Sequence, residues 1–277
     1  MALVGIPASR TSLSPTNAHE TPAAIREALR RYSPALMPSP WQKTTDLSAL
    51  TYADFGDVEE PDSAAGEART MALVREAAVR SQLVIALGGD NSVTVAAALG
   101  AWGDQIGTAG LITLDAHYDL RDGVSNGSPV RRLIEAGLNP TRVVQIGIQD
   151  FANSAAYARR ASELGITVIH RDELESRSMA DVMGQALKIA GAAGGPIHVD
   201  LDVDVCDRSV VPACPAALPG GISAYQLREA ARLAASDSRV RSMDIAEIDA
   251  SADSADGRTI RLAALCVLEA SAGVNAR

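Results

Sequence analysis

The sequence has few cysteines and no long apolar run. Its 277 residues include only three cysteines, Cys206, Cys214 and Cys266, and no two of them form a CxxC pair. A disulfide framework is therefore not expected, and a reducing, cytoplasmic compartment is the simplest interpretation. No apolar run reaches the roughly 18 residues that a membrane-spanning helix needs, so we expect no membrane segment.

Basic charge is also scarce. The formal net charge is −9 and the pI is about 5.0. Because no basic face is available to neutralise phosphates, nucleic acid is not an expected partner. The first ten residues, MALVGIPASR, lack the basic stretch that opens a signal peptide, and they predict a first strand.

Two kinds of segment alternate along the chain. Short apolar runs predict strands at 2–6, 83–87, 110–114, 142–148, 166–169, 197–203 and 240–248. Helical spacing predicts helices at 21–32, 63–82, 128–137, 153–165, 179–191, 223–235 and 259–271. Strands that alternate with helices indicate an α/β fold with a mainly parallel sheet, covered on both faces.

The length and the hydrophobic content of 47% favour one large domain that spans residues 1–277. The exception to the regular pattern is the stretch 33–62, which is Pro-rich and contains PALMPSPW at 34–41. We expect an ordered surface excursion there, and a linker or partly disordered loop is the alternative.

Polar clusters follow four of the predicted strands, where ligands of parallel sheets bind. They are GGDNS (88–92), DAHYD (115–119), DLDVDVCD (200–207) and AEID (246–249). Alternate residues of an extended segment share a face, so Asp115, His117 and Asp119 are predicted to converge. A polar turn for DAHYD and a solvated strand end for 200–207 are the simpler alternatives.

The two acidic clusters together supply at least four carboxylates and one imidazole. Burying bare carboxylates is costly, so a missing positive charge is predicted. Hard oxygen ligands with one nitrogen favour Mn²⁺ or a similar divalent ion, and the number of carboxylates indicates two ions.

The order of these motifs resembles the ureohydrolase family, which includes arginase, agmatinase and formimidoylglutamase. The motifs are GGDNS, DAHYD, SNGSP (125–129), DLDVDVCD with PGG (219–221), and MDIAEID (243–249). The resemblance implies a three-layer α/β/α sandwich with two Mn²⁺ ions per chain. It also implies a homo-oligomer, since relatives are often trimers or hexamers.

The resemblance also implies a ligand set. Asp115, Asp119 and Asp202 would hold one ion, with Asn91 as a further ligand. His117 and Asp204 would hold the second ion and share Asp115 and Asp202 with the first. The family pattern, an acid, any residue, an acid, two residues and an acid, fits Asp202, Asp204 and Asp207. Asp200 then falls outside the ligand set, and we expect it to support the ligands from beneath.

Two positions depart from the family pattern. Asn91 stands where the family usually has a His, and an amide oxygen binds Mn²⁺ more weakly than imidazole does. Asn91 would bind directly, act through water, or only cap the helix that starts near Ser92. Asn126 stands where the arginase branch has a proton-shuttling His. A relay through position 126 is therefore excluded, and solvent or Glu247 takes that role.

The expected chemistry is attack by an activated water on an amidine or guanidine carbon. Glu247 matches the family glutamate that orients the cationic, planar group of the substrate, and a surface acid is the alternative. We place Glu247 and Asp119 in the catalytic set. Arg121, Asn126 and Glu247 form the predicted substrate-binding set.

The stretch DLRDGVSNGSPVR looks most like the formimidoylglutamase branch, which cleaves N-formimidoyl-L-glutamate to glutamate and formamide. An anionic substrate end would suit Arg121, whereas agmatine would not. Arg131 and Arg132 are further candidates, with surface ion pairing as the alternative.

Other functions stay open at this point. They are an arginase, agmatinase or guanidino-acid hydrolase, a ligand-binding relative without turnover, and a one-zinc hydrolase of acylated amines. The substitutions at Asn91 and Asn126 motivate the second of these. Structural roles are expected for His19, His170, His198 and Cys206.

Overall fold

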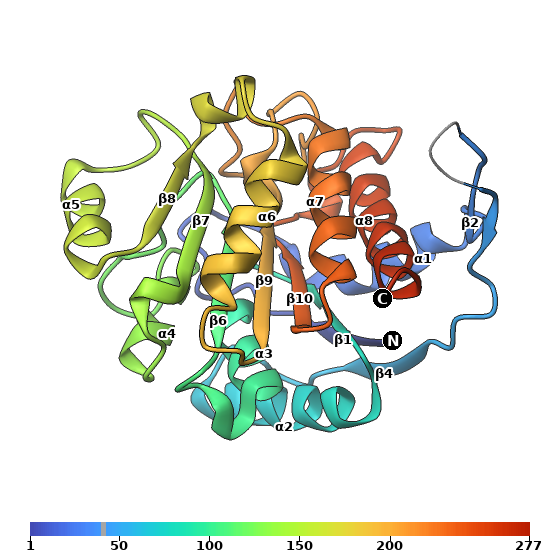
Figure 1. Ribbon diagram of the computed structural model, residues 1–277, viewed down its shortest axis with the longest axis horizontal. Helices are drawn as coiled ribbons and strands as arrows, with labels where there is room; N and C mark the ends of the chain where they lie inside the picture. Colours follow the sequence, from blue (N-terminus) through green and yellow to red (C-terminus); the bar gives the residue numbers. More distant parts are fainter. Residues whose placement is uncertain (40–42) are drawn as a thin grey trace.

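The computed structural model describes residues 1–39 and 43–277. An eight-stranded sheet forms its centre, in the order β4-β1-β5-β10-β9-β6-β7-β8, and neighbouring strands run parallel (Figure 1). The strands are β1 (Ala2–Ile6), β4 (Ala53–Asp57), β5 (Val84–Gly88), β6 (Gly110–Leu114), β7 (Val143–Ile148), β8 (Thr167–His170), β9 (Ile197–Asp202) and β10 (Val240–Ala246).

Helices cover both faces of this sheet. One layer contains α1 (Thr21–Leu29), α6 (Met179–Ala190), α7 (Ala224–Ser236) and α8 (Arg258–Asn275). The other contains α2 (Ala64–Arg80), α3 (Val93–Trp102) and α4 (Pro129–Glu135), and α5 (Ala155–Leu164) lies beside β8. The predicted three-layer α/β/α sandwich with a parallel sheet is confirmed.

All of the predicted strands and helices are present, with ends that differ by a few residues. The prediction missed α3 apart from its start near Ser92, because VTVAAALGAW is buried almost all round and has no polar face. It also missed β4, which is exposed at the sheet edge and carries no apolar pattern.

The stretch 33–62 is more regular than predicted. Besides β4 it holds β2 (Ala35–Leu36) and β3 (Thr45–Asp46), which pair antiparallel. Residues 40 and 41 of the PALMPSPW segment lie outside the described residues. Among the helices of the described chain, none has the length and apolar character to cross a membrane.

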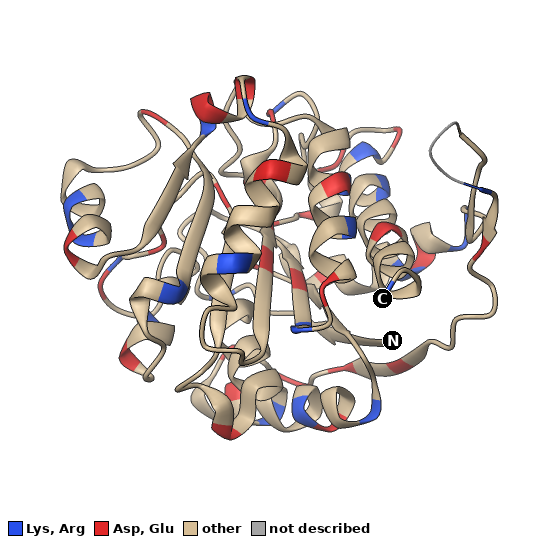
Figure 2. Ribbon diagram, in the orientation of Figure 1, with Lys and Arg blue, Asp and Glu red and all other residues tan. Residues whose placement is uncertain are grey.

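The alternation of β9 separates apolar from polar side chains. Val199 and Leu201 pack into the core beneath the α1/α6/α7/α8 layer. His198, Asp200 and Asp202 point to the opposite face, where Trp102 of α3 meets His198 edge-on at 6.3 Å between ring centroids. Figure 2 shows acidic positions within β9 and β10, in the middle of the sheet. The sequence therefore places carboxylates in the interior.

Candidate metal and active site

Four adjacent strands bring the predicted site residues together at their carboxyl ends. In the order β5-β10-β9-β6, they are followed or ended by Asn91, Glu247, Asp202 and Asp115, respectively. Asp204 lies in the short helical turn Val203–Val205 that follows β9. Because the carboxyl ends of parallel strands lie on the same side of the sheet, residues that are far apart in the sequence become neighbours there.

Hydrogen bonds from the neighbouring strand β7 and from the loop that follows it fix the loop after β6. Asn153 donates from Nδ2 to the carbonyl of Ala116 at 2.8 Å and accepts from the N–H of Tyr118 at 3.1 Å. Gln145 Nε2 donates to the carbonyl of Tyr118 at 2.8 Å. Asn153 was not predicted, although a polar amide shortly after the apolar strand Val143–Ile148 indicates a residue at the same end of the sheet. Its two hydrogen bonds hold the loop that carries His117.

His117 lies between two carboxylates. Its Nδ1 is 2.8 Å from Oδ2 of Asp204 and 3.4 Å from Oδ1 of Asp115. Asp204 also accepts from the N–H of Ala116 at 2.9 Å, and its own N–H donates to Asp202 at 2.9 Å. These contacts join DAHYD to the second acidic cluster, so the two clusters form one site.

Burial dominates the electrostatics of this site. Burial, with Asp204 alongside, raises the pKa of Asp115 to about 7. Burial also raises the pKa of Asp119 and of Asp202, and neighbouring carboxylates add to both effects. For His117 burial opposes the charged form, yet Asp204 and Asp115 raise its pKa to about 12. Burial acts to raise the pKa of Asp204 as well, but His117 lowers it below its ordinary value.

The donor set fits a pair of hard divalent cations. Oδ2 of Asp115 is buried and has no hydrogen-bond partner among the described residues. Two groups have ligand atoms within 4.8 Å of one another: Asp115, His117 and Asp204, and Asp202, Asp204 and Cys214. Asp204 belongs to both groups. Carboxylates in excess with one imidazole are typical of manganese rather than of thiolate-bound zinc.

Cys214 lies beside Asp202 and Asp204, although no motif in the sequence predicts it there. Its thiol is buried, and burial raises its pKa well above the ordinary value. Cys206 lies within the acidic motif of the sequence, but its side chain is buried in the hydrophobic core. Cys214 is ten positions beyond Asp204, and only the turn of the chain after β9 brings it back.

Asn91 faces the site with its amide nitrogen. Nδ2 donates to Oδ2 of Asp119 at 2.7 Å, while Oδ1 accepts from the Thr94 hydroxyl at 2.8 Å. No side-chain cap of α3 by Ser92 is formed. Asn91 therefore holds Asp119, and a direct bond to a cation would require its amide to turn over.

Glu247 is held by two donors. Its Oε1 accepts from the N–H of Asn91 at 2.8 Å and from Nδ2 of Asn126 at 2.7 Å. Burial raises its pKa to about 7, although these two hydrogen bonds lower it. Glu247 and Asp119 adopt left-handed backbone angles, with φ of 63° and 52°. Such conformations are costly for residues with a Cβ and occur often at functional sites.

An open cleft of about 370 Å³ leads to these residues. Its lining includes His117, Asp119, Asp202, Asp204, Glu247, Arg121, Asn126 and Tyr157. Of the basic candidates, Arg132 pairs with Glu67 at 2.8 Å and Arg131 pairs with Glu135. Those two arginines form ion pairs away from the cleft, and Arg121 is the one at its wall.

A second polar layer lies beneath the acids. Asp200 pairs in register with Asp244 of β10, and neither oxygen of Asp200 has a hydrogen-bond partner among the described residues. His198 contacts Ser242 at 2.7 Å and Asp244 at 3.0 Å. Burial and the adjacent Asp244 raise the pKa of Asp200. These residues fill the space behind Asp202 and do not reach the cleft.

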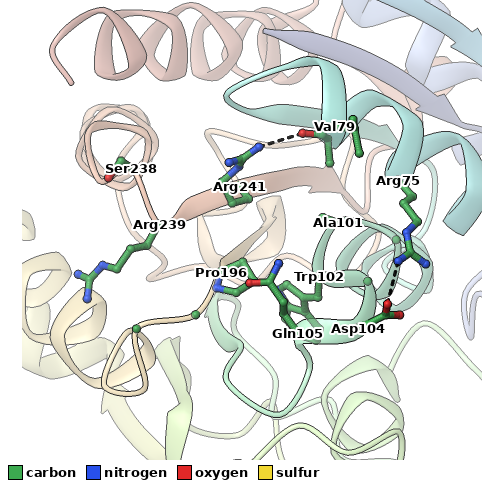
Figure 3. Close-up of a pocket in the computed structure, with 15 residues that line it drawn as sticks. Arg75, Val79, Ala101, Trp102, Asp104, Gln105, Pro196, Ser238, Arg239 and Arg241 are labelled. Carbon is green, nitrogen blue, oxygen red and sulfur yellow. Dashed lines mark hydrogen bonds and ion pairs between the residues drawn. The ribbon is translucent and has the colours of Figure 1, made fainter.

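Another cavity lies at the opposite end of the sheet, where the strands β9 and β10 begin. It has a volume of about 600 Å³, and Arg75, Arg239 and Arg241 are among its lining residues (Figure 3). Arg75 pairs with Asp104, Arg239 pairs with Asp237 and carbonyls at the end of α6, and Arg241 donates to carbonyls at the end of α2. These arginines neutralise helix ends and acids, and none of the predicted site residues lines this cavity.

Comparisons with known proteins agree with this geometry. A model of the arginase family matches residues 1–273. A formimidoylglutamase of Halalkalibacterium halodurans is 34% identical over 261 residues, 91% of this chain and 80% of the relative. The crystal structure of formimidoylglutamase from Bacillus subtilis matches with a TM-score of 0.89 and 28% identity, over 99% of this chain and 86% of that chain.

A formiminoglutamase of Trypanosoma cruzi, solved with Mn²⁺, matches with a TM-score of 0.87 over 100% of this chain and 93% of that chain. Its sequence identity of 24% makes this a likeness of fold.

Proposed function

The chain belongs to the arginase family, and on that premise we propose that its substrate is N-formimidoyl-L-glutamate. The protein is a metal-dependent hydrolase that acts on linear amidines. Water adds to the amidine carbon, the bond from that carbon to the glutamate nitrogen breaks, and L-glutamate and formamide leave. The observation that carries the proposal is a buried cluster of Asp115, Asp119, Asp202 and Asp204 with one imidazole.

Two Mn²⁺ ions are the proposed cofactors. Asp115, His117, Asp119, Asp202 and Asp204 would hold them, and Asn91 would hold Asp119 in place through its hydrogen bond. When bound, the ions supply the positive charge that makes water a nucleophile near neutral pH. The loop contacts of Asn153 keep the ligands in place before binding, which lowers the cost of organising the site.

Glu247 is the proposed partner of the cationic amidine. It lines the cleft, and its Oε1 is fixed by Asn91 and Asn126. A carboxylate binds a planar, two-nitrogen cation through paired hydrogen bonds, which orients the attacked carbon. Since burial disfavours the bare carboxylate, a cation opposite it is a favourable partner.

The departing glutamate nitrogen needs a proton. The Asn126 amide cannot carry one at neutral pH, so its role is to position Glu247. Solvent delivers the proton, or Glu247 passes on a proton that it takes up from the cationic substrate during the reaction. Asp119, which also lines the cleft, completes the catalytic set that we propose.

Arg121 is the proposed partner of the anionic end of the substrate. It stands at the wall of the cleft that Asp202, Asp204 and Glu247 also line. A guanidinium recognises a carboxylate through two parallel hydrogen bonds. Formimidoylglutamate carries carboxylates, and agmatine carries none, so the chemistry of this wall favours the former.

A parallel assay tests the proposed function. The manganese-loaded protein is compared on formimidoylglutamate, arginine, agmatine and guanidinobutyrate, and formimidoylglutamate is expected to give the highest kcat/KM. Metal-stripped protein is the control and is expected to be inactive. A higher kcat/KM on any of the three guanidines would reassign the substrate. Absence of turnover on all four compounds would contradict the proposed hydrolase activity.

Cytoplasmic localisation and self-association complete the proposal. All three cysteines are free and buried, which suits a reducing compartment. We propose a homo-oligomer, and light scattering of the purified protein tests it; a mass of one chain would contradict it.

A further inference from the structure

Arg121 has no charged partner among the described residues. It is the only arginine or lysine in the described lining of the cleft. Its neighbours Arg131 and Arg132 bind Glu135 and Glu67, respectively. An arginine without a carboxylate partner beside a cleft is free to receive one from a ligand.

Gly127 provides the space in which the Arg121 side chain lies. A Cβ atom at position 127 would be 2.7 Å from Cδ of Arg121 and 3.0 Å from its Nε. The two backbones are also joined, because the N–H of Arg121 donates to the carbonyl of Gly127 at 3.0 Å. The stem of Arg121 therefore rests on a surface that only glycine leaves open.

Tyr157 of α5 meets the other end of the same side chain. The Cζ atom of Arg121 is 5.8 Å from the centroid of the Tyr157 ring, within the range of cation–π attraction. Tyr157 lines the cleft together with Arg121 and Gly127. The long arginine side chain is thus supported at its stem and at its guanidinium, which reduces the rotamer freedom lost on binding.

We propose that Gly127 and Tyr157 are specificity-determining residues that position Arg121 as the receptor for a substrate carboxylate. The proposal rests on the proposed function for the class of substrate. Gly127 and Tyr157 themselves make no bond to the carboxylate. They act through Arg121, so their loss raises KM for a carboxylate substrate more than it lowers kcat.

Two pairs of variants test this positioning role. Gly127→Ala introduces the Cβ that displaces Arg121, and Gly107→Ala is its control because a Cβ there meets nothing within 4 Å. Tyr157→Leu removes the ring, and Tyr225→Leu is its control at a tyrosine that is 69% exposed on α7.

The first measurement is the binding of L-glutamate to manganese-loaded protein by calorimetry, which needs no turnover. Gly127→Ala and Tyr157→Leu are expected to weaken it by about tenfold or more, as expected for a charge-assisted hydrogen bond. The two control variants are expected to bind as the wild type does. The second measurement is KM for formimidoylglutamate, which is expected to rise in the same two variants.

A double-variant comparison separates positioning from a general structural effect. If Gly127→Ala acts only through Arg121, adding it to Arg121→Ala weakens glutamate binding no further. A further loss in the double variant, or binding by Gly127→Ala and Tyr157→Leu equal to the controls, overturns the proposal. Absence of turnover in a wild type whose glutamate binding follows the predicted pattern overturns only the proposed reaction.

Discussion

Replacing Glu247 by Gln should make the metal-free protein more stable and the metal-loaded protein less active. Burial raises the pKa of Glu247 from an ordinary 4.5 to about 7. At about 1.4 kcal/mol per pKa unit, the buried carboxylate costs up to about 3 kcal/mol of folding free energy. Glutamine keeps the oxygen that accepts from Asn91 and Asn126 but removes the charge, so that cost disappears.

The pH window follows from the direction of the shift. Because the folded-state pKa lies above 4.5, the folded protein holds this proton more tightly than the unfolded chain does. The contribution of Glu247 to stability therefore falls as the pH rises from about 4.5 to about 7. The glutamine variant should gain up to about 3 kcal/mol at about pH 8 and almost nothing at about pH 4.

Urea denaturation of metal-free protein at the two pH values measures this gain. Glu163→Gln, at an exposed position of α5, is the matched control and should change nothing. In the manganese-loaded protein, Glu247→Gln should lower kcat/KM by about tenfold to a hundredfold, because a charge-assisted contact to the amidine is lost. A variant no more stable than the wild type at the higher pH, or one that gains equally at both, would refute the reasoning.

Three further predictions concern the metal site. The Asn91→His variant should bind the more weakly held of the two Mn²⁺ ions more tightly in a calorimetric titration, because imidazole is a better ligand than an amide. An unchanged affinity would show that position 91 acts only by holding Asp119. Loading Mn²⁺ at about pH 8 should release at least one proton, because the metal-free protein keeps His117 protonated up to a pKa of about 12. The release should be larger at about pH 6, because the pKa of Asp115 is about 7 and its carboxyl then also holds a proton. Binding heats that do not depend on the ionisation enthalpy of the buffer would exclude this release. Cd²⁺ should give a thiolate charge-transfer absorption that Cys214→Ser abolishes, and persistence of the band in that variant would place the thiolate elsewhere.

The sequence by itself determined the strands, the helices and the position of the acidic motifs. Buried parallel strands appear as short apolar runs, and amphipathic helices between them carry a polar face, so both patterns are local. The rule that ligands bind beyond the carboxyl ends of parallel strands then predicted one site for Asp115, Asp202 and Glu247. The almost fully buried helix α3 and the exposed edge strand β4 were not predicted, because neither has one apolar face and one polar face in its sequence.

Only the tertiary structure decided which groups face one another. It turns the Asn91 amide nitrogen toward Asp119, brings Cys214 back to Asp202 and Asp204, and stacks Arg121 against Tyr157 over Gly127. Asn91 and Tyr157 meet partners 28 and 36 positions away, and Cys214 and Gly127 meet partners nearer in the chain. Every one of these contacts depends on a side-chain direction that sequence spacing leaves undefined. Acidic residues within apolar strands predict that a cation is needed. Which side-chain atom meets which partner is decided by the packing around the sheet.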